Sequence, residues 1–251
     1  FCCFNGTHKL NRFTVDRWLE ILAQVPGSVL WLLGGAETTN QRLREYAHQR
    51  GIAPERLVFA EKVPNPAHLV RYELADLFLD TTPYGAHTTA SDALWMGVPV
   101  LTVSGRSFAS RVCGSLVTAA GIPEMVCATP EEYVARAVAY GKNPESLAPI
   151  RERLRAGRDT CVLFDIPALV RSLESLYQRA WQKATQDLLP RPDLTNLEVY
   201  LEVGSQMDHE AVEVQCIQDY HAWWTDQLAR RHLHRPIPAD GRLVTDPARF
   251  P

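Results

Sequence analysis

The sequence contains no apolar run that approaches the roughly 18 to 20 residues needed to span a lipid bilayer. It has no basic excess either, because the formal net charge is −3 and the pI is about 6.3. Nucleic-acid-binding domains normally present a basic face to the phosphate backbone. We therefore expect neither a membrane nor a nucleic acid as a partner.

Paired-cysteine and metal-binding signatures are also missing. No Cys-x-x-Cys pair, Asp-x-Asp motif or tight group of histidines and cysteines occurs, so no metal site is expected. The cysteines are scattered and most lie in apolar segments, which favours buried free thiols in a reducing cytoplasm over disulfide bonds. They are Cys2, Cys3, Cys113, Cys127, Cys161 and Cys216.

The glycine fingerprint of dinucleotide-binding enzymes is absent as well. The first predicted strand is not followed by Gly-x-Gly-x-x-Gly, and Gly34-Gly35 after the second strand is a weak signal, so a dehydrogenase is not expected. The chain also lacks an initiating methionine and begins within a predicted strand, which suggests a piece of a longer protein.

Short apolar runs alternate with amphipathic segments over the first two thirds of the chain. With 46% hydrophobic residues in 251 positions, the chain can bury a substantial core. Continuous apolar runs are typical of strands covered on both faces, so we expect an α/β fold with a Rossmann-like, doubly wound parallel sheet. The predicted strands are 1–4, 28–33, 56–60, 77–80, 98–103 and 125–128. The predicted helices between and after them are 14–25 (with Thr14 as the cap), 39–50, 66–75, 108–120 and 130–140.

The remainder is predicted to be helical, because apolar residues recur there at helical spacing. A linker with prolines and a C-terminal surface tail accompany these helices. The predicted helices are 145–158, 166–188, 194–204 and 209–232, with the linker at 189–193 and the tail at 234–251. The expected domains are a nucleotide-binding lobe (1–160), a long helix that packs on this lobe (161–189), and a helical extension with an irregular tail (190–251).

The most informative stretch follows the fourth predicted strand. A turn at 81–86 leads to His87-Thr88-Thr89, which opens a helix that closes at Gly97. The first amides of a helix lack intrahelical acceptors and the helix dipole favours negative charge there, so this arrangement predicts an anion site. Two hydroxyls and an imidazole stand where a phosphate would lie. The stretch therefore indicates the phosphate-binding half of a nucleotide-using enzyme.

Several segments together resemble a known family. They are Phe4-Asn5-Gly6-Thr7-His8-Lys9, Val29-Leu30-Trp31-Leu32-Leu33, Arg56-Leu57-Val58-Phe59, Leu74-Ala75-Asp76-Leu77-Phe78-Leu79-Asp80-Thr81, the stretch from His87, and Phe108-Ala109-Ser110-Arg111-Val112. In this order and spacing they resemble the C-terminal catalytic lobe of the protein O-GlcNAc transferases, the group that includes SPINDLY, over about residues 1–180. The resemblance implies a glycosyltransferase of the GT-B type whose lobe at 1–160 binds the donor UDP-GlcNAc.

The resemblance also implies an enzymatic activity. Transfer in this family inverts the anomeric centre, uses no bound metal or other cofactor, and delivers GlcNAc to a serine or threonine of a protein or peptide. The second lobe and tetratricopeptide repeats, neither visible in this sequence, would supply the acceptor groove. The chain alone is then expected to bind UDP without transferring the sugar.

The resemblance assigns the diphosphate and the sugar to four residues. Lys9 would grip the diphosphate and help UDP depart, which is chemically reasonable because a positive charge stabilises the leaving group. His87 would contact sugar and phosphate and is the second catalytic candidate, while Thr88 and Thr89 match phosphate-binding hydroxyls. The plainer alternatives are a solvated loop lysine, and a helix cap beside a surface histidine.

The uridine is assigned to a second group of residues. Asp92 matches a ribose-binding carboxylate and shares a helix face with Thr89, although a first-turn acid also complements the helix dipole. His68 and Arg71, neighbours on one helix face, match residues that stack on the uracil and donate to its carbonyl oxygen. The backbone around Val63 would read the uracil edge. The alternative for His68 and Arg71 is an ordinary polar helix face.

Four residues depart from the family pattern. Gly6 replaces a glutamine that reaches the donor, and Asn65 replaces a lysine that can contact the ribose. Gly85-Ala86 stand where an asparagine and a small residue are common. These changes affect the expected specificity for the sugar more than the expected binding of the nucleotide. Two alternatives stay open: a UDP-sugar glycosyltransferase or epimerase with another sugar or acceptor, and a non-catalytic UDP-binding module whose helical extension docks a partner.

Overall fold

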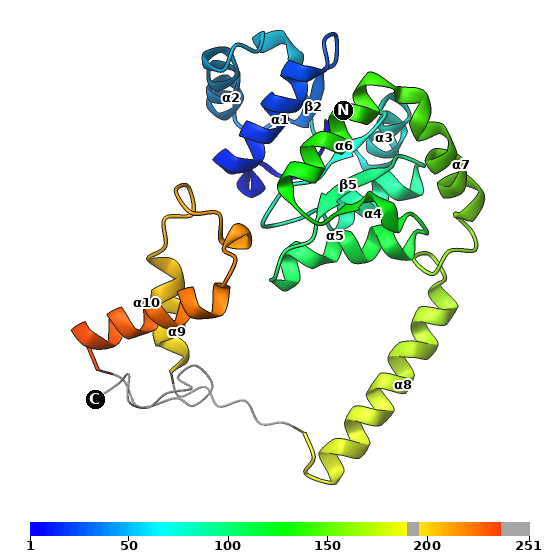
Figure 1. The fold of residues 1–251 in the computed structure, drawn as a ribbon. Helices are drawn as coiled ribbons and strands as arrows, with labels where there is room; N and C mark the ends of the chain where they lie inside the picture. The colour runs from blue at the N-terminus through cyan, green and yellow to red at the C-terminus, as the bar shows by residue number, and fades with distance from the viewer. Residues whose placement is uncertain (190–195, 237–251) are drawn as a thin grey trace. The chain divides into compact units, whose positions relative to one another are not determined.

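The structure is a computed structural model, and it describes residues 1–189 and 196–236. Six strands form one sheet in the order β3-β2-β1-β4-β5-β6, with helices around it (Figure 1). Every strand pairing is parallel, which confirms the predicted doubly wound, Rossmann-like fold. The strands are β1 (Cys2–Cys3), β2 (Leu30–Leu33), β3 (Leu57–Ala60), β4 (Phe78–Leu79), β5 (Val100–Val103) and β6 (Val126–Cys127).

The helices of the described residues follow the predicted order along the chain. They are α1 (Arg12–Gln24), α2 (Glu37–Gln49), α3 (Asn65–Arg71), α4 (Thr88–Trp95), α5 (Phe108–Ala119), α6 (Pro130–Lys142), α7 (Ala148–Gly157), α8 (Ile166–Thr185), α9 (Leu197–Ser205) and α10 (Tyr220–His234). Single 3₁₀ turns add η1 (Thr7–Lys9), η2 (Pro54–Arg56), η3 (Tyr72–Leu74), η4 (Pro123–Met125), η5 (Pro144–Leu147) and η6 (Val214–Cys216). Up to α8 the predicted elements are confirmed and differ by a few residues at their ends.

The sheet is the centre of the hydrophobic core. Strand β5 is buried at all four positions, and Phe78 in β4 has no exposed surface. Helix α1 packs against α6, while α4 packs against α5 and α7, so the sheet has helices on both sides (Figure 1). The continuous apolar runs are therefore explained by strands that are covered on both faces.

The start of α1 differs from the prediction that Thr14 is its cap. Asn11 has extended backbone angles and its side-chain oxygen accepts a hydrogen bond from the amide of Thr14 at 2.9 Å, so Asn11 is the N-cap. Thr14 is instead buried inside the helix, where its hydroxyl donates to the carbonyl oxygen of Thr82 at 3.0 Å. The hydroxyl thus ties α1 to the segment that follows β4.

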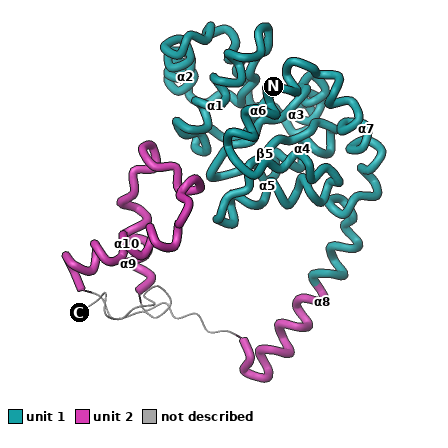
Figure 2. Tube along the Cα trace, viewed as in Figure 1, with its two compact units in different colours: residues 1–173 teal, residues 174–251 magenta. Residues whose placement is uncertain are grey.

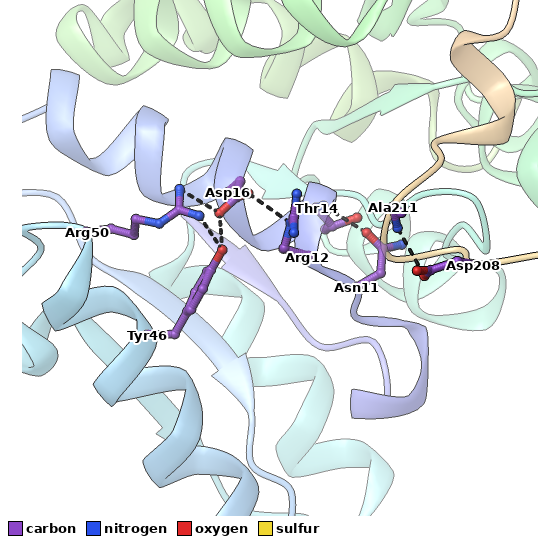
Figure 3. A network of polar contacts seen from close by, with 8 residues as sticks. All are labelled: Asn11, Arg12, Thr14, Asp16, Tyr46, Arg50, Asp208 and Ala211. Carbon is purple, nitrogen blue, oxygen red and sulfur yellow. Dashed lines mark hydrogen bonds and ion pairs between the residues drawn. The ribbon is translucent and has the colours of Figure 1, made fainter.

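Helices α1 and α2 are joined by a polar network centred on Asp16 (Figure 3). The hydroxyl of Tyr46 donates to Asp16 at 2.6 Å, and the guanidinium of Arg50 lies 3.0 Å from the same carboxylate. Burial and the acceptor Asp16 both raise the pKa of Tyr46. The network holds the helix after β1 against the helix after β2.

One helix near the C-terminus begins later than predicted. The sequence predicts a helix from 209 to 232, whereas α10 begins at Tyr220 and the 3₁₀ turn η6 lies before it. The carboxylate of Asp219 accepts from the amide of Ala222 at 2.9 Å, which makes Asp219 the N-cap. The polar residues before Asp219 form turns, because Asp208 accepts from the amides of Glu210 and Ala211.

The chain divides into two compact units, residues 1–173 and residues 174–251, and the boundary falls inside α8 (Figure 2). Helix α8 contains no buried residue. The packing of 161–189 on the lobe therefore stays a prediction. Most of the predicted linker at 189–193 and of the tail at 234–251 lies outside the described residues. Within 1–189 and 196–236, each helix is too short or too polar to span a bilayer.

Candidate active site

The candidate site lies where the strand order reverses. Strand β1 pairs with β2 on one side and with β4 on the other, and the chain leaves β1 and β4 toward opposite sides of the sheet. A crevice opens at such a point beyond the carboxyl ends of the strands. Asn5 and Lys9 follow β1, and residues 81–86, which we call the switch-point turn, follow β4.

Asp80, which is buried directly before the switch-point turn, anchors this turn through hydrogen bonds. Its carboxylate is buried and accepts hydrogen bonds from the amides of Thr81 (2.8 Å) and Ala86 (2.6 Å) and from the hydroxyl of Thr102 (2.7 Å). Burial raises the pKa of Asp80, and these hydrogen bonds act in the opposite direction. The carboxylate therefore binds both ends of the turn and fixes its path.

Lys9 reaches over this turn. Its ammonium donates to the carbonyl oxygen of Gly85 at 2.8 Å and lies 4.0 Å from the centre of the Tyr84 ring. Burial lowers the pKa of Lys9, and the charge of Asp80 counteracts this shift. A Cβ at Gly85 would lie 3.0 Å from a carboxylate oxygen of Asp80, so the close approach of the turn to Asp80 explains the glycine.

The N-terminus of α4 continues from the turn. His87 is the N-cap, Thr88 is exposed and Thr89 is half-buried. The hydroxyl of Thr89 donates to the side-chain oxygen of Asn5, so its one hydrogen is already used. Thr88 offers both hydroxyl and amide, whereas Thr89 offers its amide. The predicted phosphate-binding roles stay predictions, but the two threonines are not equivalent.

The imidazole of His87 is held between two neighbours. Its Nε2 lies 3.3 Å from the carbonyl oxygen of Ala109 in α5, and its ring centre lies 5.3 Å from that of Tyr84. A carbonyl oxygen only accepts, so Nε2 is the donor in this contact. In the neutral ring Nδ1 is then left as an acceptor.

The residues assigned to the uridine lie together. Nε2 of His68 in α3 is 3.9 Å from a carboxylate oxygen of Asp92 in α4, and the His68 ring packs edge-on against Phe4 and Tyr72. Burial lowers the pKa of His68; Arg71 lowers it further, and Asp92 acts against both. Burial raises the pKa of Asp92. The predicted base and ribose positions thus form one half-buried pair.

The loop after β3 contributes the remaining predicted positions. Both terminal nitrogens of Arg71 donate to the carbonyl oxygen of Glu61 at 3.1 Å, and its guanidinium lies 5.5 Å from the centre of the Phe4 ring. Val63 is 39% exposed, and Asn65 is the exposed first residue of α3. Their side chains are therefore open to a ligand.

Residues 1–173 match Glycosyl transferase family 41. The chain belongs to this family. It is 38% identical over 196 residues to the UDP-N-acetylglucosamine–peptide N-acetylglucosaminyltransferase of Caenorhabditis elegans, a match that covers 78% of this chain and 17% of that protein. It is 39% identical over 182 residues to the probable UDP-N-acetylglucosamine–peptide N-acetylglucosaminyltransferase SEC of Arabidopsis thaliana, covering 72% of this chain and 19% of that protein.

A solved structure agrees with these sequence relationships. A mutant of the Thermobaculum terrenum O-GlcNAc transferase superimposes with a TM-score of 0.71 and 36% sequence identity, covering 75% of this chain and 37% of that one. The resemblance stated from the sequence motifs is confirmed. This family 41 chain spans about a fifth of the length of the curated relatives, at 17% and 19% of the two named above.

Three residues that organise the site were not among the predicted site residues. Asn5 donates to the hydroxyl of Thr81 at 2.8 Å and accepts from Thr89, Asp80 anchors the turn, and Tyr84 contacts Lys9. The available signal was a polar residue within two positions of the end of a buried strand, which applies to Asn5 after β1 and to Asp80 after β4. No sequence signal placed the Tyr84 ring against Lys9. Among the described residues, no group of three His, Cys, Asp or Glu side chains could hold a metal ion.

Proposed function

We propose that this chain is the donor-binding lobe of a protein O-GlcNAc transferase, which moves N-acetylglucosamine from UDP-GlcNAc to a serine or threonine hydroxyl. Its relatives carry that activity in their names. The lobe binds the uridine diphosphate, and the acceptor protein binds to parts of the protein outside this chain, including a second lobe and tetratricopeptide repeats. No metal or further cofactor takes part.

The observation that carries the proposal is the position of Lys9. Its ammonium donates a hydrogen bond to the carbonyl oxygen of Gly85, which lies in the turn that leads directly to His87 and the first amides of α4. A diphosphate at this point meets a positive charge from one side and unpaired amides with a favourable helix dipole from the other. The ammonium and the helix amides both stabilise the negative charge that develops on UDP as it leaves.

The rest of the donor follows from the same geometry. The ribose hydroxyls donate to Asp92, and the uracil stacks near His68 with Arg71 and the backbone at Val63 at its edge. Asn65 lies beside the ribose. Nδ1 of His87 accepts from a sugar hydroxyl, because Nε2 is engaged by Ala109.

The reaction is an inverting displacement. The acceptor oxygen forms a bond to the anomeric carbon while the bond from that carbon to the UDP oxygen breaks, and the UDP oxygen keeps the electron pair. Lys9 and the first amides of α4 neutralise the charge on UDP. The proton of the acceptor hydroxyl passes to a base outside this chain. We place the reaction in the cytoplasm, a location that four buried free thiols support.

Calorimetry with UDP and a transfer assay test this proposal. The chain alone is expected to bind UDP without transferring sugar, and the full-length protein is expected to label proteins in a bacterial lysate from radiolabelled UDP-GlcNAc. Absence of UDP binding would point to a scaffold role instead. Consumption of UDP-GlcNAc without labelled protein would point to an epimerase or a small-molecule acceptor.

A different donor sugar is the second candidate, and Gly6 favours it. A Cβ at Gly6 would lie 2.7 Å from Cε1 of His8, so the glutamine common at this position would displace the His8 ring. The surroundings of the sugar therefore differ from the family pattern. UDP-glucose, offered beside UDP-GlcNAc in the same transfer assay, separates the two candidates by the rate of labelling.

A further inference from the structure

The aromatic ring of Tyr84 lies between the two residues assigned to the reacting end of the donor. Its centre is 4.0 Å from the ammonium of Lys9 and 5.3 Å from the ring centre of His87. His8 approaches from another side, with ring centres 6.1 Å apart. The Tyr84 side chain is 42% exposed, so it lies at the mouth of the site and not in the core.

Hydrogen bonds fix the backbone at Tyr84, Gly85 and Ala86. The hydroxyl of Thr81 donates to the carbonyl oxygen of Tyr84 at 2.6 Å, and the amide of Gly85 donates to Ala109 at 3.1 Å. The amide of Ala86 donates to the buried carboxylate of Asp80. The turn therefore presents the ring and the Gly85 carbonyl as one rigid receptor for an ammonium.

We propose that Tyr84 is a positioning residue: its ring face and the neighbouring Gly85 carbonyl hold the Lys9 ammonium extended over the turn, ready for the diphosphate. This inference rests on the proposed function of Lys9 and adds how that lysine is oriented. The ring quadrupole attracts a cation without forming a fixed hydrogen bond. The ammonium can thus turn its remaining N–H groups toward phosphate oxygens, which bind it more strongly.

Holding a long, flexible side chain in place reduces the entropy lost when the ligand binds. The attraction at a partly exposed site corresponds to an effect of about two- to fivefold in affinity. Tyr84→Leu removes the ring and keeps an apolar side chain, and Tyr84→Phe keeps the ring face and removes only the hydroxyl. The two variants therefore separate the contribution of the aromatic ring from that of the hydroxyl group.

The pH dependence supplies a readout that a purely structural role would not move. The diphosphate of UDP is ionised above neutral pH, and the uracil N3–H, which loses its proton at alkaline pH, does so equally for the wild type and the variants. A difference between wild type and variant in the alkaline loss of affinity therefore reports the deprotonation of Lys9. The ring stabilises the charged form, and its removal therefore lowers the pKa of Lys9. Other groups that act on the Lys9 charge are Asp80, Cys3 and Cys113, while His8 and His87 flank the Tyr84 ring. All of these stay unchanged in the two variants.

The experiment is UDP calorimetry on the full-length protein from neutral pH upward. Tyr84→Leu is expected to bind UDP about two- to fivefold more weakly and to lose affinity at a lower pH than the wild type, with Tyr84→Phe restoring both. In a Lys9→Ala background, Tyr84→Leu is expected to have no further effect. Thermal unfolding of each variant establishes that the fold is intact.

The outcomes separate this inference from the proposed function. Unchanged UDP affinity in Lys9→Ala would overturn the diphosphate assignment itself. If Lys9→Ala weakens binding but Tyr84→Leu matches the wild type in affinity and pH profile, only the role of Tyr84 is wrong. A Tyr84→Leu defect that persists in the Lys9→Ala background would likewise overturn it, because the ring would then act on something other than Lys9.

Discussion

The side-chain oxygen of Asn5 accepts a hydrogen bond from the hydroxyl of Thr89, and this contact ties the end of β1 to the first turn of α4. Asn5 is buried, and its amide nitrogen donates at the same time to the hydroxyl of Thr81 at 2.8 Å. One side chain thus sets the spacing between the segment that carries Lys9 and the helix that receives the diphosphate.

Asn5→Ala should therefore affect both stability and binding. It leaves the hydroxyls of Thr81 and Thr89 without this partner, and the expected loss in the free energy of unfolding is about 1–3 kcal/mol. Urea denaturation measures this loss, and calorimetry should show weaker UDP binding. Equal stability of variant and wild type would contradict the bridging role.

Asn5→Asp is the informative companion, because it keeps an oxygen for Thr89 but sets a carboxylate beside buried Asp80. Burial and a like charge raise the pKa of the new carboxyl in the folded state. Such a group contributes most stability at low pH and loses it as the pH rises through the raised pKa. The stability deficit of Asn5→Asp should accordingly shrink on acidification.

Lys9→Ala should remove activity without unfolding the protein. Within the part of the chain that the structure describes, the ammonium contacts the Gly85 carbonyl and the Tyr84 ring at the mouth of the site, so little folding energy depends on it. Loss of a group that stabilises the leaving oxygen costs about 10²–10³-fold in kcat. Steady-state transfer by the full-length protein measures this, with Lys142→Ala at the exposed end of α6 as the matched control. Turnover that survives in Lys9→Ala would remove the diphosphate assignment.

Asp92→Asn should weaken UDP binding by about 1–2 kcal/mol, as expected when a hydrogen bond loses its charged acceptor. It should also lower the pKa of His68 further, because the Asp92 charge now opposes the lowering by burial and Arg71. Arg71→Gln should shift the pKa of His68 in the opposite direction. NMR titration of the His68 ring measures both shifts, and shifts of the same sign in the two variants would contradict the pairing.

Arg56→Ala should destabilise the fold and leave the site intact. Its guanidinium donates to the carbonyl oxygens of Ser28 (2.7 Å), Leu22 (2.9 Å) and Val25 (2.9 Å), which closes the C-terminus of α1. Loss of this fork is expected to cost about 2–3 kcal/mol in the free energy of unfolding. Arg56→Lys should recover only part of it, because an ammonium lacks the planar fork.

UDP affinity should not change in Arg56→Ala, since Arg56 precedes β3 and the site lies beyond the carboxyl ends of the strands. Urea denaturation and calorimetry on the same sample test the two statements together. Weaker UDP binding in a folded Arg56→Ala protein would show that the two ends of the sheet are coupled.

The hydrophobic pattern of the sequence was sufficient for the strands, most helices and the fold class. Strand β5, for example, is buried at every position and apolar at three of its four positions, and this pattern is local. Helix ends were less predictable. Thr14 and Asn11 are both good caps, and the contact between Thr14 and Thr82, distant in sequence, decided between them. Asp219 likewise delayed α10 beyond the predicted start.

The sequence alone determined the fold, the family and a set of candidate donor-binding residues, because these depend on short-range patterns and on motifs in a fixed order. The tertiary structure alone decided which side chains meet. Lys9 and Gly85 are 76 positions apart and touch only because β1 and β4 are neighbours in the sheet. The roles of Asn5, Asp80 and Tyr84 arise from that pairing, since a local sequence pattern carries no information about which strand lies beside which.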